Sequence, residues 1–192
     1  MKTAFKEWAV VVDALGRGDQ ILILRKGGIH DGRQGFRPEY DRFWLFPTAF
    51  HQQRDSVIPE ARSRYDQLAV ASSPPKGSVA IQFLAELEQT CEIASLESAL
   101  NLREHHIWTE EVIRARFDWG GSRRIHALLL KVWSLPEPFP IQDRPDYGGC
   151  RSWIELEEDI AETRLQPVMS AAALASRCAA IELILSEAPV LK

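Results

Sequence analysis

The strongest constraint on the fold is a nearly continuous apolar run, HALLLKVW, at residues 126–133. Such a run is typical of a strand with both faces buried, because a strand with one face in solvent alternates apolar and polar residues. A second strong pattern lies at 170–186, where Leu174, Cys178, Ile181 and Leu185 recur at helical spacing behind Ser170, a favoured helix N-cap type. The sequence therefore predicts a sheet with a central strand and a C-terminal helix packed against it.

Weaker patterns predict the remaining elements. Apolar or alternating segments bounded by glycine and proline predict strands at 5–14, 21–24, 43–48, 79–87, 112–118 and 152–154. A helical interpretation of 80–89 competes with the strand there. Helical spacing predicts helices at 55–70, 94–102 and 155–165, and the glycines and prolines of 27–41, 72–77 and 135–149 predict loops.

Together these elements predict an α+β fold, a mixed β-sheet with flanking helices. The first two strands are expected to form a hairpin through the turn at Gly16 and Gly18. We expect one core domain at 1–166, with 167–192 as a C-terminal helix packed on it.

Composition narrows the classes of function. The 192 residues carry a net charge of −4, so no bulk attraction to nucleic acid or to an anionic membrane follows. The basic excess lies in two stretches, 1–54 and 102–133, which a fold could bring together around an anion. Three widely spaced cysteines without a CxxC motif indicate neither a disulfide framework nor a cysteine zinc site, which fits a reducing cytoplasm. No apolar run approaches ~18 residues, so we expect a soluble protein with no membrane partner.

Four segments resemble the bacterial family of domain of unknown function 1802. They are KEWAVVVDALGRGDQILILRKGG, FWLFPTAFHQQ, HHIW and YGGCRSWIEL, and the resemblance covers roughly residues 5–185. It supplies no catalytic residues. Some family members are associated with restriction-endonuclease-type domains, which implies a nucleic-acid context.

The order of elements is also similar to Nudix domains, in which a hairpin, a long loop and a tryptophan strand precede a helix. Nudix hydrolysis requires a Gly-led box with RExxEE, so that several glutamates bind Mg²⁺. The segment AFHQQRDSVIPEARSRYDQL lacks this box. The similarity therefore implies a binding module without the usual metal-dependent hydrolysis, and no cofactor is expected.

The sharpest candidate site is the aromatic strand at 43–48 with the polar residues after it. Trp44 is a candidate stacking platform for a base, and Thr48, His51 and Gln52 are candidate hydrogen-bonding groups. Core packing of the aromatic residues is the alternative.

Basic residues supply candidate phosphate contacts. Arg25 and Lys26 precede two glycines, and Arg116 lies in a stretch where arginines flank an aromatic residue. If 112–118 is a strand, Arg114 and Arg116 share one face. Solvated strand ends and an edge strand protected by charge are the alternatives.

His51 and His105 are candidates for a general acid or base, because a histidine titrates near neutral pH. Trp108 lies close to His105 in HHIW and completes the candidate set. The leading hypothesis is a nucleotide- or nucleic-acid-binding module. The alternatives are a metal-independent nuclease or phosphohydrolase component that uses His51 or His105, and a scaffold that forms a homodimer through its C-terminal helix.

Overall fold

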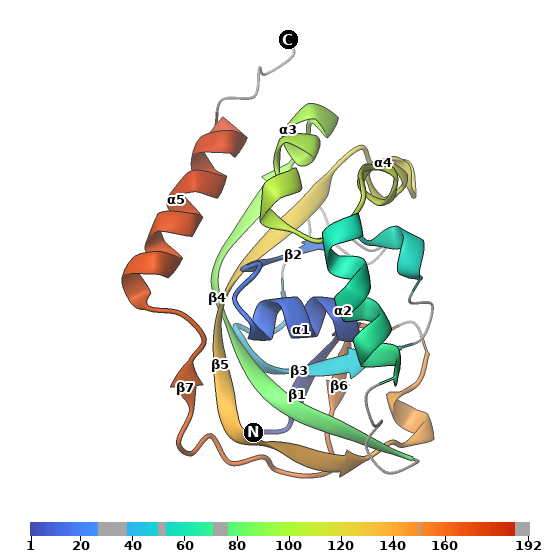
Figure 1. Ribbon diagram of the computed structural model, residues 1–192, viewed down its shortest axis with the longest axis vertical. Coiled ribbons are helices and arrows are strands. Elements are labelled where there is room, and N and C mark those ends of the chain that lie inside the picture. Colours follow the sequence, from blue (N-terminus) through green and yellow to red (C-terminus); the bar gives the residue numbers. More distant parts are fainter. Residues whose placement is uncertain (27–37, 50–52, 71–76, 150, 187–192) are drawn as a thin grey trace.

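The computed structural model describes residues 1–26, 38–49, 53–70, 77–149 and 151–186. Within them one curved, mixed sheet carries the fold (Figure 1), in the order β2-β5-β4-β3-β1-β6 with β7 paired to β5. The strands are β1 (Thr3–Trp8), β2 (Leu22–Arg25), β3 (Arg42–Thr48), β4 (Ser78–Ile93), β5 (Ile125–Gln142), β6 (Trp153–Glu155) and β7 (Gln166–Pro167). Only the β1–β3 pair is parallel among these strands. The α+β fold is therefore confirmed.

Five α-helices and three short 3-10 turns accompany the described strands. The helices are α1 (Ala9–Gly16), α2 (Pro59–Val70), α3 (Leu96–Asn101), α4 (Glu110–Asp118) and α5 (Ala171–Ser186). Figure 1 shows α1 lying across the curved sheet with α2 beside it, while α5 stands apart from both, alongside β4. The 3-10 turns are η1 (Arg54–Ser56), η2 (Arg103–His105) and η3 (Pro145–Tyr147). None of the described helices is both long and apolar enough to cross a bilayer.

The sheet buries apolar side chains on both faces. The larger core lies between one face and the helices, and it contains Phe5, Phe43 and Leu45. The smaller core contains Trp44 and Phe46, whose side chains alternate with those of the larger core along β3. This arrangement explains why the aromatic strand carries no polar face.

Several predicted elements are confirmed. β5 includes the apolar run 126–133, whose residues 127–130 are all buried, as expected for a central strand. Ser95 caps α3 by accepting a hydrogen bond from the Ser98 N–H at 3.4 Å, and Ser170 accepts one from Ala173 at 3.2 Å at the start of α5. Leu174 and Ile181 of α5 are buried as the helical spacing predicted.

The hairpin predicted for the first two strands is wrong. The chain leaves β1 at Trp8 and enters α1, in which Val10, Val11, Ala14 and Leu15 are buried. Their spacing fits one side of a helix, so burial against the core outweighs the preference of valine for strands. Consequently β2 pairs with β5 and not with β1, and the observed fold lacks the opening hairpin on which the Nudix similarity depended.

The strand predicted at 112–118 is also wrong, because this segment forms α4. Its buried residues, Ile113 and Phe117, lie four positions apart and therefore on one helical face. Arg114 is exposed whereas Arg116 is half-buried, so the two arginines do not share a face.

The helix predicted at 155–165 does not form. The Leu156 N–H donates to the carbonyl of Lys2 at 2.8 Å, and the Ile160 N–H donates to that of Met1 at 3.3 Å. This backbone therefore bonds to the N-terminal segment instead of to itself, while Leu156 and Ile160 fill the smaller core.

The proline-rich segment predicted as a loop belongs largely to β5, which continues to Gln142 and pairs with β4. Pro140 is paired with Ala80 of β4, whereas Pro136 and Pro138 lie between Ser134 and Phe139, where the register with β4 shifts. Proline lacks the N–H of a regular ladder and is tolerated at such irregularities. Pro136 and Pro138 therefore interrupt no regular pairing with β4.

Candidate functional site

Three strand ends converge near one end of the sheet. β1 and β3 run parallel and end at paired residues, Trp8 and Thr48. β2 ends at Arg25, whose Nη2 donates to the Oγ of Ser152, immediately before β6. Because β2 and β6 are the two ends of the strand order, Arg25 links the two ends of the curved sheet by a side-chain contact.

Glu7 is the buried anion of this region, with 6% of its surface exposed. Its Oε2 lies 3.6 Å from Nη1 of Arg25, and its Oε1 accepts a hydrogen bond from the Trp8 N–H at 2.8 Å. Thr48 Oγ1 donates to the Glu7 carbonyl at 3.2 Å. A buried carboxylate is stable only when paired and hydrogen-bonded, so Glu7 ties the three strand ends together.

Arg116 brings a second cation into the neighbourhood of this carboxylate. It extends from α4, and its Nη1 donates to the carbonyl of Leu24 in β2 at 2.8 Å. Burial lowers the pKa of the Arg116 guanidinium from its usual value; the charge of Glu7 opposes this shift and the charge of Arg25 adds to it. The Glu7 carboxylate is thus paired with Arg25 and lies within the electrostatic influence of Arg116.

Two tryptophans complete the region. The rings of Trp8 and Trp108 meet edge to face, with centroids 4.7 Å apart. The guanidinium carbon of Arg116 lies 4.8 Å from the centroid of the Trp108 ring, within cation–π range. Trp108 is buried and Trp8 is half-buried. We call Glu7, Trp8, Arg25, Trp108 and Arg116 the arginine–tryptophan cluster.

The structure thus brings together four of the candidate residues, Arg25, Thr48, Trp108 and Arg116. Trp44 is not among them. Its side chain is fully buried in the smaller core and its Nε1 donates to the Met1 carbonyl at 3.1 Å. Trp44 presents no surface for stacking, so that interpretation is wrong.

Lys26 has a structural function. Its Nζ donates to the carbonyl of Phe117 at 2.6 Å and to that of Ser122, at the C-terminal end of α4. A cation is favourable there because the helix dipole is negative at its C-terminus. Burial lowers the pKa of the Lys26 ammonium.

The histidine candidates are not joined to the cluster by any contact that the structure describes. His51 and Gln52 lie outside the described residues. His105 lies in η2, where burial lowers its pKa and the charge of Arg177 on α5 lowers it further, against the effect of Glu104. Its catalytic function stays a prediction.

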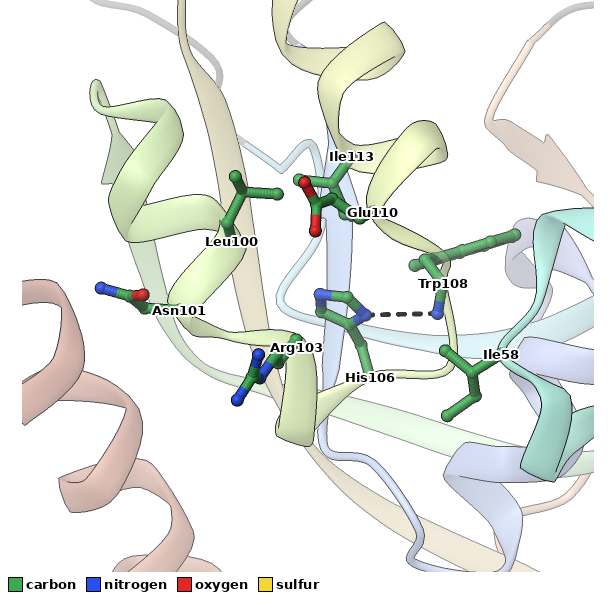
Figure 2. A pocket seen from close by; sticks show the side chains of 8 residues that line it. All are labelled: Ile58, Leu100, Asn101, Arg103, His106, Trp108, Glu110 and Ile113. Atoms are coloured by element: carbon green, nitrogen blue, oxygen red, sulfur yellow. Dashed lines mark hydrogen bonds between the residues drawn. The ribbon is translucent and has the colours of Figure 1, made fainter.

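Four residues were missed by sequence reasoning. Glu7 and Trp8 fell inside a predicted longer strand, although a single glutamate on the same face as Phe5 was a usable signal. Ser152 carried no signal. His106, next to the candidate His105, is buried and lines a pocket (Figure 2).

The pocket has a volume of about 270 Å³ and lies where α2, α3 and α4 meet. Trp108 belongs both to the pocket wall and to the arginine–tryptophan cluster. The lining residues are Ile58, Leu100, Asn101, Arg103, His106, Trp108, Glu110 and Ile113. Within the described part of the chain, no three His, Cys, Asp or Glu side chains are grouped to hold a metal ion.

Residues 4–180 match the family model described as Domain of unknown function (DUF1802). The chain belongs to the DUF1802 family. The match covers all of the sheet except Thr3, together with the arginine–tryptophan cluster, the pocket and most of α5. The resemblance drawn from the four sequence segments is therefore confirmed. No curated protein matches this DUF1802 chain significantly.

Among solved structures, the DUF1802 chain is similar to the ASCH protein of Zymomonas mobilis. The TM-score is 0.47 at 16% identity, over 81% of this chain and 87% of that one. Two single-substitution variants of the same protein give TM-scores of 0.48 and 0.45 at 15% and 17% identity, each over 81% of this chain and over 88% and 90% of theirs.

Proposed function

We propose that this DUF1802 domain binds a nucleotide or nucleic acid, with a phosphate at the arginine–tryptophan cluster. The observation that carries the proposal is that two arginines lie near the single buried carboxylate of Glu7, Arg25 in an ion pair with it and Arg116 through the effect of its charge. These three groups have a net charge of +1. A phosphate in contact with both guanidinium groups would supply the missing negative charge in a partly buried place, where charge pairing is stronger than in water.

Both arginines keep donors for such a contact. Arg25 uses its guanidinium on Ser152 and Glu7, and Arg116 donates to the Leu24 carbonyl. A guanidinium has five N–H groups and pairs with phosphate in a bidentate manner. The Arg25 side chain is 27% exposed and therefore reaches solvent.

Trp8 supplies the aromatic surface that Trp44 does not. Its ring is half-buried and held by Trp108, so a base that stacks on it would gain about 1–3 kcal/mol. α1 begins directly after Trp8 and has no acidic residue in its first turn. The positive end of the helix dipole therefore adds to the attraction for an anion.

Replacing Arg116 by glutamine should weaken binding of a fluorescein-labelled single-stranded oligonucleotide about tenfold at low salt, because one charge-assisted contact is lost. Fluorescence anisotropy measures this directly. Arg123→Gln is the matched control, since it removes the same charge from a side chain that is 73% exposed and lies after the C-terminal end of α4. It should change the affinity less than twofold.

Arg116 also holds the Leu24 carbonyl, so a thermal melt of each variant must accompany the titration. Arg116→Lys keeps the charge without the bidentate fork, and its affinity should lie between those of the original chain and Arg116→Gln. Equal weakening by Arg116→Gln and Arg123→Gln would refute the assignment. Absence of binding of DNA, RNA and mononucleotides to the unaltered chain at low salt would refute the function.

A further inference from the structure

The pocket beside Trp108 contains a buried hydrogen-bond donor without a partner. His106 has 4% of its surface exposed, and its Nδ1 accepts the Trp108 N–H at 3.2 Å. A neutral imidazole that accepts at Nδ1 carries its proton on Nε2. Nε2 is buried, and no hydrogen-bond partner for it exists among the described residues. Such a group costs free energy unless something in the pocket accepts its hydrogen bond.

An acceptor lies across the pocket from this donor. Figure 2 shows the Glu110 carboxylate on the same side of the imidazole as the ring nitrogen that makes no bond to Trp108. Arg114 neutralises the charge of Glu110 through bonds of 2.8 and 2.6 Å, and both end on Oε1. Oε2 of Glu110 therefore retains its capacity to accept a hydrogen bond.

The remaining walls limit the ligand to a compact molecule. Ile58, Leu100 and Ile113 form the apolar part of these walls, and Asn101 and Arg103 also line the pocket. A volume of about 270 Å³ lies just below the usual range for ligand pockets. A ligand between His106 and Glu110 cannot be an ammonium, which could not accept from His106, and a carboxylate there would meet the Glu110 carboxylate.

We propose that this pocket binds a small uncharged molecule through an amide edge. Its carbonyl accepts the Nε2–H of His106, and its adjacent N–H donates to Oε2 of Glu110. Two kinds of molecule have such an amide edge: a free lactam or amide, and a nucleotide with a uracil-type base. Trp108, shared with the arginine–tryptophan cluster, places the pocket beside the proposed phosphate contact.

The probe is 2-piperidone, which is titrated into the protein. Binding is observed by NMR through the ¹⁵N resonances of the histidine side chains. We expect saturable shifts of the His106 signals and binding at least fivefold tighter than that of N-methyl-2-piperidone, which cannot donate to Glu110. His106→Asn keeps an acceptor near the Trp108 N–H but lacks the donor that reaches the pocket, so affinity should fall at least fivefold. His105→Asn is the matched control, because His105 does not line the pocket, and should leave the affinity unchanged.

Equal binding of the two piperidones would overturn the proposal, as would equal losses in the two histidine variants or unmoved His106 signals. If His106→Asn fails to fold, the comparison of the two piperidones on the unaltered chain decides alone. Comparing the affinities of uracil and uridine 5′-monophosphate distinguishes a free molecule from a nucleotide as the ligand. This comparison rests on the proposed function. Tighter binding of the monophosphate that is lost in Arg116→Gln assigns the pocket to a nucleotide, whereas equal binding assigns it to a free molecule.

Discussion

Replacing Trp44 by alanine should lower the free energy of unfolding by about 3–5 kcal/mol, the range expected when a large aromatic side chain is removed from a packed core. Trp44 is fully buried, and its indole N–H is bonded to the Met1 carbonyl. The alanine would leave a cavity in the smaller core and remove one of the two hydrogen bonds to the Met1 carbonyl, which keeps the one from the Ile160 N–H. Urea denaturation followed by circular dichroism measures the loss.

Trp119→Ala provides the matched control, because the same substitution removes a side chain that is 62% exposed. Its free energy of unfolding should change by no more than about 0.5 kcal/mol. The opposite pattern would restore Trp44 as a binding platform: a Trp44→Ala chain of unchanged stability that had lost affinity for oligonucleotides would contradict its placement in the core.

Acid should destabilise the folded chain through His106. Burial, together with the positive charges of Arg116 and His105, lowers the pKa of His106 to about 4. In the unfolded chain its pKa is about 6.5. Between these values the unfolded state binds more protons, so stability is fully present above the unfolded pKa and falls as the pH drops towards 4.

The contribution of His106 to this loss should be about 2 kcal/mol between pH 7.5 and pH 5. His106→Asn removes the titrating ring, so its stability should fall by that much less over the same interval. Chemical denaturation at each pH measures the difference, in which the other titrating groups largely cancel. His105→Asn should show a smaller effect, because His105 is less buried. Parallel pH curves for the original chain and His106→Asn would show that His106 does not titrate as its burial requires.

The fold was predictable where local pattern and tertiary packing agree. The apolar run of β5 is buried only as a central strand, and the apolar stripe of α5 is buried only as one face of a helix. Segments rich in valine, such as α1, fit the periodicity of a helix and that of a strand. Which of the two forms depends on which face meets the core. The segment after β6 was unpredictable for another reason, because its backbone partners, Met1 and Lys2, lie far away in sequence.

The candidate site was likewise predictable only in part. Sequence reasoning selected Arg25, Trp108 and Arg116 because charged and aromatic residues are visible in a sequence, and the structure places them in the same region as Thr48. The choice of His105 over His106 was not resolvable from pattern, because His105 ends a 3-10 turn and His106 begins the extended segment after it, a boundary that the sequence does not mark. Which of them points inward depends on the packing of α2, α3 and α4. Glu7 was hidden because its importance comes from two arginines more than a dozen residues away.

The alternating prolines of β5 also determine how this chain meets its own copies. A long exposed strand edge normally offers a row of N–H groups on which another chain can assemble, and that is the first step towards fibrils. Pro136, Pro138 and Pro140 carry no N–H group, so this stretch offers fewer donors than an ordinary strand edge. The longest strand of the sheet is therefore a poor template for aggregation at high concentration, and the irregular register with β4 between Ser134 and Phe139 makes this edge less regular still.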